Sequence, residues 1–288
     1  MVLRARGARL ATVATTVALL VSAAPAGAAS RTSVVASFYP IAWAVQQVGG
    51  DRVSVTNLTP AGAEPHDLEL TPDQIDEVLD AKVVFELGRG FQPAVEQAAD
   101  QRDGRTVQLL PRGTTDPHVW LDPVRMATIV RTVQRELTRA DPEGRAVYAR
   151  NADRVLGELD ALDTRYRDGL AQCERTVIVT AHEAFGHLAE RYGLRQEGVA
   201  GLSPDAEPDA KRIAQLSDLV QRDGVTTVFT EELVSPRIAR TLAREAGVRT
   251  ATLNPLEGLT EREVRRGDDY VSVMDANLAK LQRALGCT

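Results

Sequence analysis

The chain of 288 residues is predicted to be an α/β protein of two lobes, each with a four-stranded, mainly parallel sheet flanked by helices. Short runs rich in Val, Ile and Thr alternate with stretches of helical periodicity, as they do in βαβ units. One helical stretch near the middle is much longer than the others and leaves four candidate strands on either side. The alternative is one large doubly wound domain, which the length also permits.

The first 29 residues are predicted to be a signal peptide. Three arginines, at positions 4, 6 and 9, precede an apolar run at 10–21 that is too short to span a bilayer comfortably, and small residues at 26–29 offer a cleavage site. The alternative is an uncleaved anchor helix. No lipoprotein cysteine follows the apolar run, so we expect an exported protein, periplasmic or extracellular, that is soluble after cleavage.

The rest of the chain divides into an N-terminal lobe at 30–141, a linking helix at 142–172 and a C-terminal lobe at 173–288. Pro142 suits the first turn of the linking helix, and apolar residues recur along it at helical spacing. Because a continuous helix is stiffer than a Gly/Ser linker, we expect the lobes to flex little. The candidate strands are Ser33–Ser37, Val53–Thr56, Lys82–Glu86, Thr106–Leu109, Thr176–Thr180, Gln196–Val199, Thr227–Thr230 and Thr250–Leu253.

Three of the four histidines follow predicted strands, at the edge where open parallel sheets bind ligands. His66 follows the second strand, His118 the fourth, and His182 the first strand of the second half. Neutral imidazole is the commonest side-chain metal ligand, and three imidazoles with a further position suit zinc. Spacing alone does not separate this interpretation from unrelated surface or capping histidines.

Two neighbouring patterns have simpler interpretations. His187 lies five residues after His182, and one helix cannot easily aim both rings at one ion, so we predict that His187 lies outside the site. Asp122 followed by Pro123 is typical of a helix N-cap and first turn, which leaves His118 free to face the cleft.

Composition and absent motifs exclude several functions. A net charge of −6 with no large basic patch argues against nucleic-acid binding. The sequence has no phosphate loop, no dinucleotide glycine fingerprint and no Gly-x-Ser-x-Gly elbow, so we expect no enzyme activity. A secreted zinc hydrolase is the alternative from another class, because three histidines with an open position also describe a catalytic site.

The chain resembles the metal-receptor (solute-binding) proteins of bacterial zinc and manganese ABC transporters, in particular the zinc-uptake branch, over essentially all of the mature sequence. The motifs that carry the resemblance are Val-Ala-Ser-Phe-Tyr-Pro-Ile at 35–41, Gly-Ala-Glu-Pro-His-Asp-Leu-Glu-Leu-Thr-Pro at 62–72, Pro-His-Val-Trp-Leu-Asp-Pro at 117–123, Thr-Ala-His-Glu-Ala-Phe-Gly-His-Leu at 180–188, Val-Phe-Thr-Glu-Glu at 228–232 and Leu-Asn-Pro-Leu at 253–256.

This resemblance implies two four-stranded lobes joined by a long backbone helix, with the metal in the cleft between them. It implies His66, His118 and His182 as metal ligands, and a histidine at the third position favours Zn²⁺. The expected function is capture of zinc and its delivery to a membrane ABC permease with its ATPase, by a monomer that a metallochaperone could load. A manganese or iron receptor of the same fold is the alternative within this class.

The sequence leaves two candidates for the fourth metal position, Asn254 and Glu231. The family often has an aspartate ligand where this chain has Asn254. We expect water or a weak oxygen contact from this region, so that an Asn254→Asp change raises zinc affinity. Glu231, at a neighbouring strand end, is the other candidate, directly or through water.

The two cysteines, Cys173 and Cys287, are predicted to form a disulfide. Export would carry them to an oxidising compartment, where pairing is the rule. Two buried thiols, or a thiolate metal ligand, are the alternatives. A bridge would pin the last helix to its lobe.

Overall fold

The first sheet has four parallel strands in the order β2-β1-β3-β4. The computed structural model describes residues 1–2, 31–206 and 208–288. Three helix-bearing crossovers connect these strands, so all four carboxyl ends lie at one edge, where ligand-binding loops gather in open α/β sheets. The strand bounds are Thr32–Ala36 for β1, Val53–Asn57 for β2, Val83–Glu86 for β3 and Arg105–Gln108 for β4.

Helices cover both faces of this sheet, which explains why its central strands are apolar on both sides. One face packs against α1 (Tyr39–Gly49) and α4 (Pro123–Ala140), and the other against α2 (Pro72–Asp80) and α3 (Pro93–Ala99). The predicted cap of α4 is confirmed, because Asp122 Oδ1 accepts a hydrogen bond from the Val124 backbone N–H at 2.9 Å.

The second sheet repeats the same topology, with parallel strands in the order β6-β5-β7-β8. One face is covered by α7 and α8, and the other by α6 and α10. The bounds are Val177–Thr180 for β5, Gly186–Arg191 for α6, Arg195–Gly198 for β6, Ala210–Arg222 for α7, Thr227–Thr230 for β7, Arg237–Glu245 for α8, Arg249–Thr252 for β8, Glu261–Arg266 for α9 and Tyr270–Leu285 for α10.

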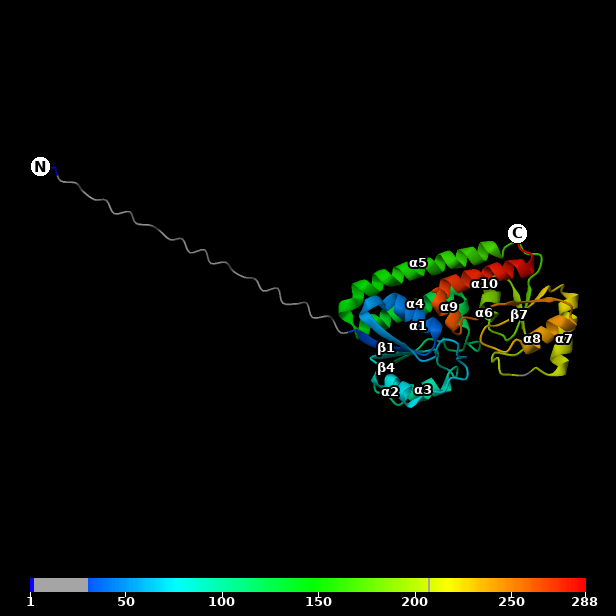
Figure 1. Cartoon of the computed structure of the whole chain (residues 1–288), viewed down its shortest axis with the longest axis horizontal. Coiled ribbons are helices and arrows are strands. Elements are labelled where there is room, and N and C mark those ends of the chain that lie inside the picture. Colours follow the sequence, from blue (N-terminus) through cyan, green and yellow to red (C-terminus); the bar gives the residue numbers. More distant parts are fainter. Residues whose placement is uncertain (3–30, 207) are drawn as a thin grey trace. The chain divides into compact units, whose positions relative to one another are not determined.

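The predicted long helix is α5, Arg145–Gly169, which follows the short helix η3 (Pro142–Gly144). Figure 1 shows α5 lying along α10, and the hydroxyl of Tyr166 in α5 donates to the Met274 carbonyl in α10 at 2.7 Å. The largest hydrophobic core includes side chains from both sheets and from both of these helices. Residues 31–288 therefore form one compact unit, and the predicted boundaries at 141 and 173 remain predictions.

The predicted disulfide is confirmed. Cys173, between α5 and β5, is bonded to Cys287, which follows the left-handed cap of α10 at Gly286. The backbone around the two residues also pairs, since the Thr288 N–H donates to the Gln172 carbonyl at 3.1 Å. The chain end is thus fastened to the start of the second half.

The predicted signal peptide lies, except for its first two residues, outside the described residues. Within the described ranges, 1–2, 31–206 and 208–288, no helix is both long and apolar enough to cross a membrane.

A partly buried ion pair fastens the start of α5 to the first sheet and supports a stability prediction. Arg52, in the short helix Gly50–Arg52 (η1) before β2, donates to both carboxylate oxygens of Asp141 at 2.7 and 2.9 Å, and the Tyr148 hydroxyl donates at 2.6 Å. Hydrogen bonding from Arg52 lowers the pKa of Asp141 from 3.8 to about 2. The ionised carboxylate therefore stabilises the fold above pH 3.8, and this contribution is lost as pH falls through about 2.

We expect Asp141→Asn to lower the melting temperature at pH 7 by roughly 3–5 °C, because charged hydrogen bonds are lost. Thermal unfolding of wild type and variant between pH 2 and 7 should show that their difference in melting temperature shrinks as the pH approaches 2. Glu158→Gln is the control, because Glu158 pairs with Arg154 on the exposed face of α5 and should matter little. Equal effects of the two changes would contradict the prediction.

Candidate metal centre

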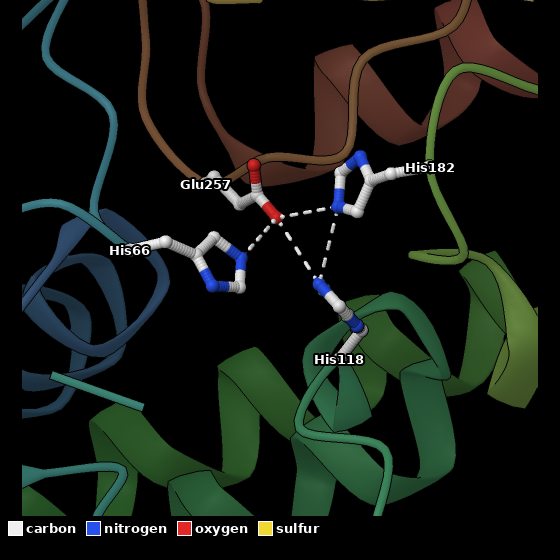
Figure 2. A group of neighbouring side chains, drawn as sticks. All are labelled: His66, His118, His182 and Glu257. Atoms are coloured by element: carbon white, nitrogen blue, oxygen red, sulfur yellow. Dashed lines mark hydrogen bonds and ion pairs between the residues drawn. The ribbon is translucent and has the colours of Figure 1, made fainter. Parts of the chain in front are cut away.

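Four side chains from four loops meet between the two sheets: His66, His118, His182 and Glu257 (Figure 2). The carboxylate oxygen Oε1 of Glu257 lies 3.3, 3.2 and 3.1 Å from the Nε2 atoms of His66, His118 and His182, respectively. The Nε2 atoms of His118 and His182 are 3.3 Å apart. The three predicted histidines are therefore brought together, two from the first half of the chain and one from the second.

The dimensions of this cluster suit a small tetrahedral cation. Zinc bonds to imidazole nitrogen are about 2.0–2.1 Å long, and corners of such a tetrahedron lie roughly 3.3 Å apart. The contacts of Glu257 with the histidines match that separation, and all four candidate ligand atoms lie within 4.8 Å of one another. Contraction of the wider pairs toward that separation would bring every ligand to bonding distance of one ion.

His118 is held by the Asp-Pro turn that precedes it. Asp116 Oδ1 accepts hydrogen bonds from the backbone N–H of His118 at 2.9 Å and from its ring Nδ1 at 2.8 Å. A carboxylate at Nδ1 fixes the tautomer that leaves the Nε2 lone pair free for a metal. The ring is fully buried, and its orientation is set before any ion binds.

His182 is held in the same way, by Glu231 at the end of β7. Both carboxylate oxygens of Glu231 lie 2.8 Å from His182 Nδ1, and Oε1 also accepts from the His182 backbone N–H at 3.1 Å. Glu231, the other candidate for the fourth position, therefore does not belong to the group of four. Its carboxylate binds the side of the ring that faces away from the cluster, and it orients a candidate ligand.

His66 is the most exposed member of the cluster, with 11% of its side chain accessible. Its backbone N–H donates to Glu64 Oε2 at 2.8 Å, and its ring packs edge-on against Phe91. A pocket of about 220 Å³ opens beside it, lined by loops of both halves that include Pro117 and Leu202. Solvent and ions can reach the buried cluster from this side.

Asn254, the other residue expected at the fourth position, does not contact the cluster. Its side-chain oxygen accepts from the Leu256 backbone N–H at 2.7 Å, and its Nδ2 donates to Glu263 at 3.0 Å. The fourth member is Glu257, which the sequence analysis missed. The signal that would have found it is a carboxylate in the loop that follows the last strand, at the same sheet edge as the histidines.

The cluster strongly favours positive charge. Burial opposes protonation of His182, but hydrogen bonds with Glu231 and Glu257 outweigh it and raise the pKa of His182 to about 10. Burial likewise disfavours the ionised form of Glu257, but contacts with the three histidines hold its pKa well below the usual 4.5. Burial and the charge of Glu257 raise the pKa of the adjacent Glu64 to about 8. The ionised Glu257 carboxylate thus stabilises a cation placed among the rings, whereas Glu64 without such a cation is mostly neutral at pH 7.

His187 lies outside the cluster, as predicted. It is the second residue of α6, which begins at Gly186, and its Nε2 lies 3.0 Å from the backbone carbonyl of Asp116. It touches the turn that holds His118 and contributes no atom to the group of four.

Comparison with known proteins gives one consistent family. The model for zinc-uptake complex component A, periplasmic (ZnuA), matches residues 34–284. The zinc-binding lipoprotein AdcA of Streptococcus pneumoniae is 36% identical over 278 residues, which cover 88% of this chain and 56% of AdcA. The high-affinity zinc uptake system protein ZnuA of Bacillus subtilis is 34% identical over 277 residues, covering 88% of this chain and 87% of ZnuA.

The structural comparison agrees. The crystal structure of the Zn(II)-bound ZnuA-like domain of Streptococcus pneumoniae AdcA aligns with a TM-score of 0.77 and 36% identity, over 89% of this chain and 99% of that domain. The chain spans about half the length of the AdcA relatives, and it matches their ZnuA-like part.

Proposed function

The chain belongs to the zinc-uptake complex component A family, and from this membership we propose that it is an extracytoplasmic receptor that binds one Zn²⁺ and delivers it to an ABC permease for import. The proposed ligands are His66, His118, His182 and Glu257, and the zinc ion is the cargo. The observation that carries the proposal is the approach of one buried carboxylate oxygen to three imidazole Nε2 atoms at 3.3, 3.2 and 3.1 Å.

The donor set supports zinc over manganese or iron. Three imidazoles and one carboxylate suit a borderline-soft ion with four ligands, whereas Mn²⁺ prefers more oxygen donors and a higher coordination number. Every proposed ligand atom comes from the chain itself, and two of the three rings are completely buried. Such a cage favours tetrahedral zinc and disfavours ions that keep several waters.

The fourth position also supports a receptor over a zinc hydrolase. Catalytic zinc sites keep one position open for water, whereas closed sites fill all four with protein ligands. Glu257 supplies that fourth group here, so no position is reserved for a nucleophile. We propose that the protein is not an enzyme.

The remaining expectations complete the proposal. Residues 1–29 direct export, and the mature protein acts as a soluble monomer outside the cytoplasm. Its partners are the permease with its ATPase, and a metallochaperone that loads it is a further candidate. N-terminal sequencing and intact mass of the exported protein test the cleavage and the absence of lipid.

Metal analysis of untagged protein, followed by titration against a chelator of known affinity, tests the function directly. We expect one zinc per chain and much tighter binding of Zn²⁺ than of Mn²⁺. Hydrolase substrates should remain intact with the zinc-loaded protein. A chain that holds no zinc after purification, and takes up none against a weak chelator, would overturn the proposal.

Glu231 provides a prediction about the support of the site. We expect Glu231→Ala to weaken zinc binding about 10- to 100-fold, because the Nδ1 of buried His182 loses the carboxylate that orients the ring. The neighbouring Glu232→Ala is the matched control, since Glu232 does not belong to the group of four or bond to His182. The chelator titration measures both, and equal affinities in the two variants would contradict this role.

A further inference from the structure

Glu257 follows a residue with an unusual backbone. Leu256 has a φ of 57°, in the left-handed region that residues with side chains rarely adopt. Its side chain is completely buried, so the conformation is not that of a loose surface loop. Such conformations persist only where surrounding contacts over-determine them, and they occur often at ligand-binding sites.

Asn254 supplies the contact that holds this turn. Its Oδ1 accepts from the Leu256 backbone N–H at 2.7 Å, while its Nδ2 donates to Glu263 Oε1 at 3.0 Å. Its own backbone forms two hydrogen bonds with the side chain of Asn277 in α10, which accepts from the Asn254 N–H at 3.0 Å and donates to the Asn254 carbonyl at 2.6 Å. Asn254, Glu263 and Asn277 are all buried, so these bonds are sheltered from competing water.

The same turn is tied to the loops that carry two of the histidines. The ring Nε1–H of Trp120, two residues after His118, donates to the Pro255 carbonyl at 2.8 Å. The Gly62 N–H, in the loop of His66, donates to the Leu259 carbonyl at 2.9 Å. The position of the Glu257 carboxylate relative to the rings is therefore set by the shape of residues 254–259.

We propose that Asn254 is a positioning residue for metal binding, which acts by locking the left-handed turn at Leu256 so that Glu257 is in place before the ion arrives. This inference rests on the proposed function, in which Glu257 is a zinc ligand. A ligand fixed in advance loses little conformational freedom on binding, which raises affinity. Asn254 thus contributes to affinity without approaching the ion.

The role requires an amide. Asn254 must accept from a backbone N–H and donate to the Glu263 carboxylate, which accepts on Oε1 from Asn254 and on Oε2 from the backbone N–H and the hydroxyl of Thr260. An aspartate accepts but does not donate when ionised, and it would set two buried carboxylates against each other. The sequence led us to expect that Asn254→Asp raises zinc affinity. The structure predicts the opposite, and Asn254→Asp should weaken zinc binding.

A double-mutant cycle tests the proposal. We expect Asn254→Ala to weaken zinc binding about 10- to 100-fold in the wild-type background, as changes to groups that orient ligands do. In a Glu257→Ala background the same change should alter affinity less than about threefold, because the ligand that Asn254 positions is gone. A general loss of structure would instead weaken binding equally in both backgrounds. Asn151→Ala is the control, since the Asn151 side chain also bonds a backbone group, donating to the Val48 carbonyl at 3.0 Å, and Asn151 does not belong to the group of four.

A second pair of variants tests the proposal if Asn254→Ala folds poorly. Asn254→Asp should weaken binding, and Asn254→Asp with Glu263→Gln should restore most of the affinity, because the new amide donates across the same contact. Full affinity in Asn254→Ala, additive effects in the cycle, or no rescue by Glu263→Gln would each overturn the role of Asn254. Absence of zinc binding in the wild type would instead overturn the proposed function.

Discussion

Replacing His118 with alanine is expected to weaken zinc binding by about a hundredfold or more. Four-ligand zinc sites bind with roughly 10–16 kcal/mol, so one ligand accounts for about 3 kcal/mol or more of that free energy. The Nε2 of His118 lies 3.2 Å from Glu257 Oε1 and 3.3 Å from His182 Nε2, so its loss opens one corner of the tetrahedron. It also leaves the Asp116 carboxylate without the ring N–H that it holds at 2.8 Å.

His187→Ala is the control for this prediction. The His187 ring contacts the Asp116 carbonyl and lies outside the cluster, so its removal should change zinc affinity by no more than a few-fold. Competition against a chelator of known affinity measures both variants, and circular dichroism checks that each is folded. If His118→Ala binds zinc as tightly as wild type, the proposed ligand set is wrong.

The three histidines were predictable because the residues around each one in the sequence indicate its position in the fold. A predicted strand precedes each one, and the carboxyl ends of parallel strands share an edge. That reasoning needs no knowledge of how the two sheets pack. It brings His66, His118 and His182 toward one region, and the structure brings them together.

The fourth member was not predictable in the same way. Glu257 lies five residues beyond the end of β8, and its direction depends on the left-handed turn at Leu256. That turn depends on Asn254, Glu263 and Asn277, which are separated by up to 23 residues and meet only in the folded chain. Glu231 directly follows its strand, as predicted, but sequence does not reveal which nitrogen of His182 it faces.

The strands were predicted almost to the residue. For central strands such as β3 and β7 the reason is burial on both faces, which requires a short run rich in apolar residues. The contacts that join the two halves were harder to predict from sequence. Tyr166 of α5 reaches Met274 of α10, and Tyr270 of α10 reaches the Trp120 carbonyl at 2.5 Å, contacts that span 108 and 150 residues. Only the packed structure reveals this continuous core.

The Cys173–Cys287 disulfide should have the largest effect on stability. The bond links residues 114 positions apart, so it closes a loop that contains the whole second sheet and its helices. Constraint of the unfolded chain over a loop of this length contributes up to about 5 kcal/mol. For a unit of this size that corresponds to a fall in melting temperature of roughly 10 °C or more when both cysteines become serine.

Thermal unfolding of metal-free protein in a chelator measures this effect, because bound zinc would itself stabilise the folded state. The double Cys→Ser variant is preferred, since a single change leaves a free thiol. Reductant should lower the melting temperature of the wild type to that of the variant and leave the variant unchanged. Zinc affinity well below the transition should change little, because neither cysteine belongs to the group of four. The backbone bonds between Gln172 and Thr288 and between Arg175 and Leu285 do not depend on sulfur. If these backbone bonds alone hold the chain end, the variant will have the same melting temperature as the wild type, and the disulfide adds nothing to stability.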